Sequence, residues 1–196
     1  MINSPRFKEA IELFDEANGK DPNFEEHNGQ KYPKELLYAR RMTDRLYEFE
    51  PLADEALQLA VRCQHLRRWE IPREDFDMNR VGYLQWRNKL KSFHAEGAAR
   101  ILEEVGYEKE IIDRVKFLLL KKQLKKDRVT QTLEDVICLV FLEFYFEKFS
   151  YKYQEDKLID ILQKTWKKMS EKGQKAALQL KLSDHSLNLI EKALDT

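Results

Sequence analysis

Residues 131–149 decide the fold, and they read Gln-Thr-Leu-Glu-Asp-Val-Ile-Cys-Leu-Val-Phe-Leu-Glu-Phe-Tyr-Phe-Glu-Lys-Phe. From Val136 to Phe146 the stretch is apolar on every side except at Glu143. A helix that is hydrophobic all round lies inside a bundle and not on its surface. The apolar run is shorter than the ~20 residues that a membrane-spanning helix needs, so we expect a buried helix and no membrane.

The start of this helix places two carboxylates next to the core. Thr132 is a suitable N-cap, since its hydroxyl can accept a hydrogen bond from a free N–H group of the first turn. Glu134 and Asp135 would then lie in that first turn, where negative charge suits the helix dipole. We therefore expect both carboxylates at the mouth of the core.

Apolar residues recur at helical spacing through the rest of the chain. Helix starts are marked by prolines and helix ends by glycines, as at Pro5 and Gly106. The expected helices before the central one cover residues 5–18, 33–49, 51–71, 82–105 and 108–125, and those after it cover 154–171, 173–181 and 184–194. Residues 20–32 and 72–81 are expected to be loops. No strand pattern competes, so the sequence predicts an all-α, single-domain bundle of about eight helices.

The composition excludes several classes of partner. The 196 residues carry 35 Lys and Arg against 35 Asp and Glu, so no global field attracts the protein to nucleic acid or to a membrane surface. The first residues contain no apolar segment of the kind that a secretory signal needs. Cys63 and Cys138 both lie in apolar stretches, which indicates buried, reduced thiols and a cytoplasmic protein.

Two histidines and one aspartate are candidate metal ligands. His65 lies near the end of the expected third helix, His94 on the apolar face of the fourth, and Asp135 at the start of the central one. Two imidazoles and a carboxylate from three helices form a facial set that binds a divalent metal with open positions. Arg68 would hold a phosphate against that metal, and Glu134 would orient a ligand or accept a proton, so both are candidate catalytic residues. The alternative is a hydrogen-bonded polar cluster that only fixes helix packing.

A set of basic and aromatic residues is a candidate site for a small anionic or phosphorylated ligand. Arginine forks bind phosphate or carboxylate with two hydrogen bonds and stack on indole rings. The candidate ligand-binding residues are Arg67, Arg68, Arg73, Arg80, Trp86, Arg87 and Lys121. The competing interpretation is a solvated loop with structural ion pairs to the interleaved acids Glu70, Glu74, Asp75 and Asp77.

Several motifs together resemble one family. The motifs are Gln64-His65-Leu66-Arg67-Arg68-Trp69, then Gly82-Tyr83-Leu84 with Trp86-Arg87, then His94-Ala95, then Leu133-Glu134-Asp135-Val136 with Cys138-Leu139-Val140-Phe141-Leu142, and finally Lys164-Thr165-Trp166 with Lys168-Met169-Ser170. Their order resembles the uncharacterised domain of unknown function 4202 over nearly the whole chain. That resemblance implies no established activity.

The order of features is also similar to that of the HD superfamily of metal-dependent phosphohydrolases. His94-Ala95-Glu96-Gly97-Ala98-Ala99 matches a histidine segment of that superfamily, and Asp135-Val136 matches its closing aspartate. Gln64-His65 stands where the signature His-Asp pair belongs, Tyr38 replaces the first histidine, and Lys121 or Lys122 replaces a later one. The resemblance implies an HD-like core over residues 33–150, followed by a helical extension over 151–196.

These departures leave three functional hypotheses. In the first hypothesis, the metal site is rebuilt around His65, His94 and Asp135, and the protein is a phosphohydrolase acting on a nucleotide or small phosphate ester. Alternatively, the pocket holds no metal and binds a phosphorylated or carboxylated molecule through its arginines. In the third hypothesis, the chain is a protein-interaction scaffold with a structural polar core. No glycine-rich phosphate loop, Gly-x-Ser-x-Gly or Cys-x-x-Cys motif adds another class of enzyme.

Overall fold

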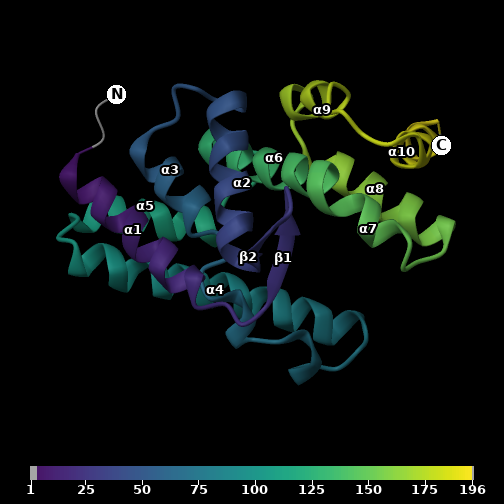
Figure 1. Cartoon of the computed structure of the whole chain (residues 1–196). Helices are drawn as coiled ribbons and strands as arrows, with labels where there is room; N and C mark the ends of the chain where they lie inside the picture. The colour runs from purple at the N-terminus through teal and green to yellow at the C-terminus, as the bar shows by residue number, and fades with distance from the viewer. Residues whose placement is uncertain (1–3, 196) are drawn as a thin grey trace. The chain divides into compact units, whose positions relative to one another are not determined.

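The computed structural model describes residues 4–195, and these contain ten α-helices and one short antiparallel hairpin (Figure 1). The all-α prediction is therefore confirmed. The chain forms two compact units. The first contains the described residues up to Tyr47 together with Pro51–Lys122, and the second contains Glu48–Glu50 and the described residues from Gln123 onward.

The first unit has a core of aromatic, aliphatic and small side chains, among them Phe14, Leu59 and Ala98. Its elements are α1 (Pro5–Gly19), β1 (Phe24–His27), β2 (Gln30–Pro33), α2 (Lys34–Phe49, whose last two residues join the second unit), α3 (Glu55–Arg62), α4 (Arg80–Glu104) and α5 (Lys109–Leu119). Helix α5 packs against α3 and α4, and α1 also packs against both. Side chains cap α1, α3 and α4 at Ser4, Asp54 and Asn79.

The expected loop over residues 20–32 is wrong in part, because residues 24–33 form the hairpin. Phe24 is paired with Pro33 and His27 with Gln30. The turn consists of Asn28 and Gly29, whose φ angles are 51° and 74°. An Asn-Gly pair with positive φ at both residues is the preferred two-residue hairpin turn, so the signal was present in the sequence.

The second unit is organised around the predicted central helix. Its elements are α6 (Arg128–Val140), a π-helical turn (Phe141–Tyr145), α7 (Phe146–Ser150), α8 (Glu155–Lys168), α9 (Glu171–Ala177) and α10 (Asp184–Leu194). Helices α8 and α9 pack against α6, while α10 packs against α7 and α8. Val136, Leu139, Val140 and Phe146 are fully buried, so the run contributes to the core as predicted. Four of its apolar residues are only half-buried, so the run is not buried on every side: Ile137, Phe141, Phe144 and Tyr145.

The predicted start of the central helix is wrong. Asp127 is the N-cap, and its carboxylate accepts the Thr130 N–H at 2.7 Å. The Thr132 hydroxyl donates to the Arg128 carbonyl inside the helix at 3.0 Å. Aspartate is among the strongest N-caps, and here it begins the helix one turn before the apolar residues. Glu134 and Asp135 therefore lie beyond the first turn, and the helix dipole does not explain them.

Two other boundaries affect the candidate residues. Helix α3 ends at Arg62, so His65 lies in the turn that follows the helix. Helix α5 ends at Leu119, and the expected basic last turn is replaced by turns in which Lys121 has a left-handed φ of 54°. Cys63 and Cys138 are both buried, as predicted. In residues 4–195, none of the helices has the length and apolar character that crossing a membrane requires.

Candidate functional site

Glu35, near the start of α2, is the centre of a polar cluster in the first unit. Its carboxylate lies 3.0 Å from His65 Nδ1 and 3.8 Å from Arg68 Nε. Its own backbone N–H donates to Asp21 Oδ2 at 3.0 Å, which fixes the first turn of α2. Only 7% of the Glu35 side chain is exposed. Because a buried carboxylate needs partners, His65 and Arg68 stabilise it in place.

The His65 ring is held on its face as well as on its edge. Tyr38, one helical turn after Glu35, stacks on it with ring centroids 4.0 Å apart and planes inclined by 15°. The Tyr38 hydroxyl donates to Gln64 Oε1 at 2.9 Å. A carboxylate can only accept, so we assign the Nδ1–H tautomer to His65. Its Nε2 atom has no hydrogen-bond partner in the described part of the chain. Unlike Nε2 of His94, it is not one of the fully buried polar atoms that lack a partner.

His94 lies beside His65, with ring centroids 5.9 Å apart. The His94 Nδ1 atom is 2.8 Å from the Leu66 carbonyl, to which it donates. This bond joins the middle of α4 to the segment after α3. The His94 Nε2 atom is buried and has no partner among the described residues. An unsatisfied buried nitrogen in a native structure calls for an explanation, either structural or functional.

Burial and nearby cations keep both imidazoles neutral. Burial lowers the pKa of His94 to about 3, with a further contribution from His65. Burial also lowers the pKa of His65 well below its usual range, and Arg68, Arg87, Lys121 and Lys34 add to this effect. The pKa of Glu35 is raised by burial, against the attraction of Arg68. The cluster is thus a group of neutral histidines in a positive environment.

Arg68 is the candidate arginine that joins this cluster most directly. Its guanidinium lies over the Trp86 ring at 4.7 Å from the centroid, and 20% of its side chain is exposed. It makes no side-chain hydrogen bond with the described residues and has the ion pair with Glu35 as its sole salt bridge there. Trp86 is fixed by donation from its Nε1 to the Ile71 carbonyl at 2.9 Å. Arg87, next to it, has no hydrogen bond or ion pair through its side chain with residues 4–195.

The other arginines of the candidate set have different roles. Arg67 forms two hydrogen bonds with the Glu70 carboxylate at 2.5 and 2.8 Å, an ion pair of the kind that the competing interpretation predicts. Arg73 donates to the carbonyls of Phe76 and Asp77 and so closes the loop before α4. Arg80 is exposed. Lys121 is half-buried and near enough to His65 to affect its pKa.

Asp135 belongs to the second unit and has a structural environment there. Its carboxylate accepts hydrogen bonds from Ser170 N at 2.8 Å, Ser170 Oγ at 2.5 Å and Gln131 Nε2 at 3.0 Å. A side chain at Gly173 would lie 2.7 Å from this carboxylate, so only glycine fits there. Asp135 thus fixes the start of α9. Glu134, its neighbour on α6, is buried.

The sequence predicts that His65, His94 and Asp135 bind a divalent metal. The structure brings the two histidines together in the first unit, each bonded through Nδ1 in the manner that orients metal-binding imidazoles. Over residues 4–195, no group of three or more His, Cys, Asp or Glu side chains is arranged to hold a metal ion. Metal binding therefore stays a prediction.

Sequence reasoning missed Glu35. It follows Pro33 and Lys34 in the first turn of a helix, where an acidic residue has an ordinary explanation in the helix dipole. His65 is 30 residues away in the chain. No local spacing links the two residues, so the sequence carried no signal for this pair.

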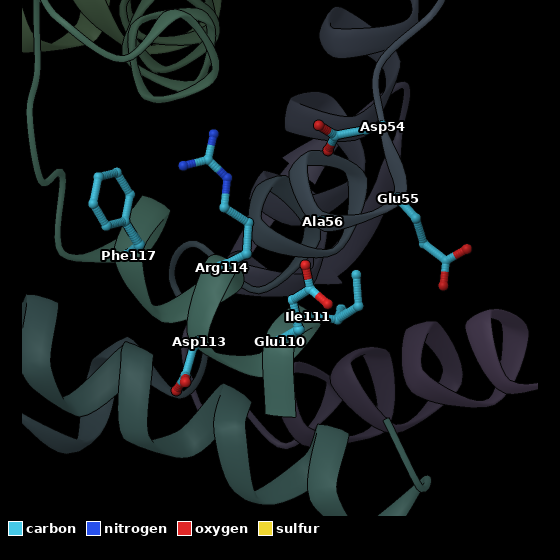
Figure 2. Close-up of a pocket in the computed structure, with 8 residues that line it drawn as sticks. All are labelled: Asp54, Glu55, Ala56, Glu110, Ile111, Asp113, Arg114 and Phe117. Carbon is cyan, nitrogen blue, oxygen red and sulfur yellow. The ribbon is translucent and has the colours of Figure 1, made fainter. Parts of the chain in front are cut away.

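A separate pocket of about 570 Å³ lies between the start of α3 and α5 (Figure 2). Figure 2 shows Arg114 and Phe117 on one side of it and Asp54 with Glu55 on another. Three of its four acids have structural partners: Asp54 caps α3, Glu55 accepts the Tyr107 hydroxyl at 2.7 Å and Asp113 is bonded to Lys109. We therefore regard it as a surface hollow formed by structural residues.

The fold and the cluster define an all-α domain with a buried Glu–His–Arg group near the start of α2. A family profile described as domain of unknown function (DUF4202) matches residues 8–190 of this chain. The chain belongs to that family. No curated protein and no solved structure matches it.

Proposed function

We propose that this protein binds a phosphorylated or carboxylated small molecule at the cluster around Glu35, with Arg68 and Arg87 as the anion-binding residues. The observation that carries the proposal is the incomplete pairing of Arg68. A mostly buried guanidinium has five N–H donors, yet Arg68 has one ion pair, at 3.8 Å, and no side-chain hydrogen bond with the described residues. A bound oxyanion would satisfy these donors.

The charge balance supports the same ligand class. The cations that act on His65 are Arg68, Arg87, Lys121 and Lys34, while Glu35 is the acid in contact with it. A group of like charges around one partly open side chain favours an anion, and low local polarity strengthens the attraction. Trp86 holds the Arg68 plane, which lowers the entropy lost on binding.

Anion-dependent stabilisation tests the proposal. We expect phosphate to raise the melting temperature more than chloride does at equal ionic strength, in a saturable manner. Arg87→Gln should remove most of this difference, and Arg68→Gln should do the same. Arg80→Gln is the matched control, because Arg80 is exposed in the same helix as Arg87. Equal stabilisation of wild type and Arg87→Gln would refute the assignment.

A second candidate is a metal-dependent phosphohydrolase of the HD type, which the sequence motifs suggest. The observation in its favour is that both imidazoles are bonded through Nδ1, so that His65 and His94 offer Nε2 as ligand atoms. A divalent metal would supply a hydroxide from bound water and polarise a phosphoryl oxygen. Arg68 would hold the phosphate of the substrate.

Elemental analysis separates the two candidates. If the protein is the hydrolase, protein purified from metal-supplemented cultures should contain a transition metal. A chelator should then lower its melting temperature. His94→Asn should then remove the metal. Protein that binds phosphate but holds less than about a tenth of an equivalent of metal supports the binding protein alone. Protein that responds to neither anion nor metal is the outcome that the interaction-scaffold hypothesis predicts.

A further inference from the structure

We propose that the anion recognised at this site is monohydrogen phosphate, with its P–OH group donating a hydrogen bond to His65 Nε2 while its charged oxygens are bound by Arg68 and Arg87. This inference rests on the proposed anion site and changes its preferred ligand from a phosphorylated or carboxylated molecule to inorganic phosphate itself. Monohydrogen phosphate carries a P–OH proton, which sulfate and the dianion of a phosphate monoester lack.

The acceptor character of His65 follows from its contacts. Glu35 occupies Nδ1 at 3.0 Å, and a carboxylate needs a donor there, so the proton is on Nδ1 and the lone pair is on Nε2. Stacking against Tyr38 at 4.0 Å prevents the ring from turning over to exchange the two nitrogens. Since Nε2 has no partner in the described part of the chain, it is available to a ligand.

The same carboxylate positions the cation. One Glu35 oxygen contacts His65 Nδ1 and the other lies 3.8 Å from Arg68 Nε. The two side chains therefore contact opposite oxygens of one carboxylate, and the charge of Arg68 acts on the His65 ring. In the proposed site, a small ligand lies between the Arg68 guanidinium and His65 Nε2. A site with donors on one side and a lone pair on the other requires a ligand that both accepts and donates.

Few small anions meet this requirement. At about pH 8, inorganic phosphate is mainly a dianion with one P–OH donor, whereas sulfate has the same charge and no donor. A phosphate monoester, whose second pKa is about 6, is likewise a dianion without a donor. A lone pair facing sulfate or a monoester would gain no hydrogen bond, so both anions should bind more weakly than phosphate.

The experiment compares inorganic phosphate, sulfate and methyl phosphate by isothermal titration calorimetry at about pH 8, where an ordinary histidine is neutral. We expect phosphate to bind roughly tenfold more tightly than either of the other two, the value of one buried hydrogen bond. Similar affinities for all three would overturn the inference and leave the anion site intact. The absence of binding by all three would overturn the anion site and the inference with it.

A substitution tests whether the His65 imidazole causes the preference for phosphate over sulfate. His65→Asn keeps an N–H group that can donate to Glu35 and removes the Nε2 acceptor, so it should bind phosphate and sulfate with similar affinity. His185→Asn, an exposed histidine of α10, is the matched control and should keep the preference. A preference for phosphate that persists in His65→Asn would show that another group accepts the proton and would refute the role of His65.

Discussion

Replacing Asp135 with asparagine separates a structural role from a metal-binding role for this carboxylate. Asp135 is 2% exposed, and it accepts from Ser170 N, Ser170 Oγ and Gln131 Nε2. Ser170 in turn caps α9 by accepting the Gly173 N–H at 3.0 Å. The carboxylate therefore supports the N-terminus of α9 through a buried hydrogen-bond network.

The cost of Asp135→Asn can be worked from these bonds. Asparagine keeps one acceptor oxygen but places an NH₂ group where the second oxygen accepted from Ser170. One hydrogen bond to a charged acceptor is lost, and the Ser170 hydroxyl has to turn its proton away from the new NH₂ group, which costs about 2 kcal/mol. The close fit at Gly173 leaves no room for the side chain to move away. We therefore expect the free energy of unfolding to fall by about 2 kcal/mol.

Urea unfolding followed by far-UV circular dichroism measures this change, with EDTA present throughout. Asp160→Asn is the control, because its ion pair with Lys164 is exposed and should contribute less than about 0.5 kcal/mol. If Asp135 were a metal ligand alone, Asp135→Asn would have wild-type stability in EDTA and would differ only with metal present. An unchanged urea midpoint in EDTA would refute the structural role.

Two further predictions concern the cores of the two units. Burial lowers the pKa of His94 from 6.5 to about 3, so below about pH 6.5 the unfolded chain gains a proton that the folded state does not bind. The free energy of unfolding should therefore fall by about 1.4 kcal/mol between neutral pH and about pH 5.5 through this group, and His94→Asn should show a smaller fall in urea titrations at the two pH values. Val140 is fully buried in α6, so Val140→Asp places an unpaired charge in the core and should abolish the cooperative unfolding of the second unit. Lys148→Asp, on the exposed face of α7, should leave a wild-type transition in the same assay.

Some of the differences between expectation and structure came from local signals that were present in the sequence. The hairpin turn at Asn28-Gly29 and the N-cap at Asp127 both follow from the chemistry of a few adjacent residues. Asp127 begins the helix well before Thr132, so Asp135 lies in the interior of α6.

The sequence alone determined the helices and the buried position of the central one, because hydrophobic periodicity and capping act over a few residues of chain. It also identified His65, His94 and Arg68 as candidate site residues, and the structure brings these three together. Only the tertiary structure decided that Glu35 joins them and that Asp135 is bonded to Ser170 in the second unit. Glu35 and His65 are 30 residues apart, and the chain between His65 and Arg68 turns at Arg67, which has a left-handed φ of 52°. Which side chains converge is set by the packing of distant elements, and no spacing within a single helix records it.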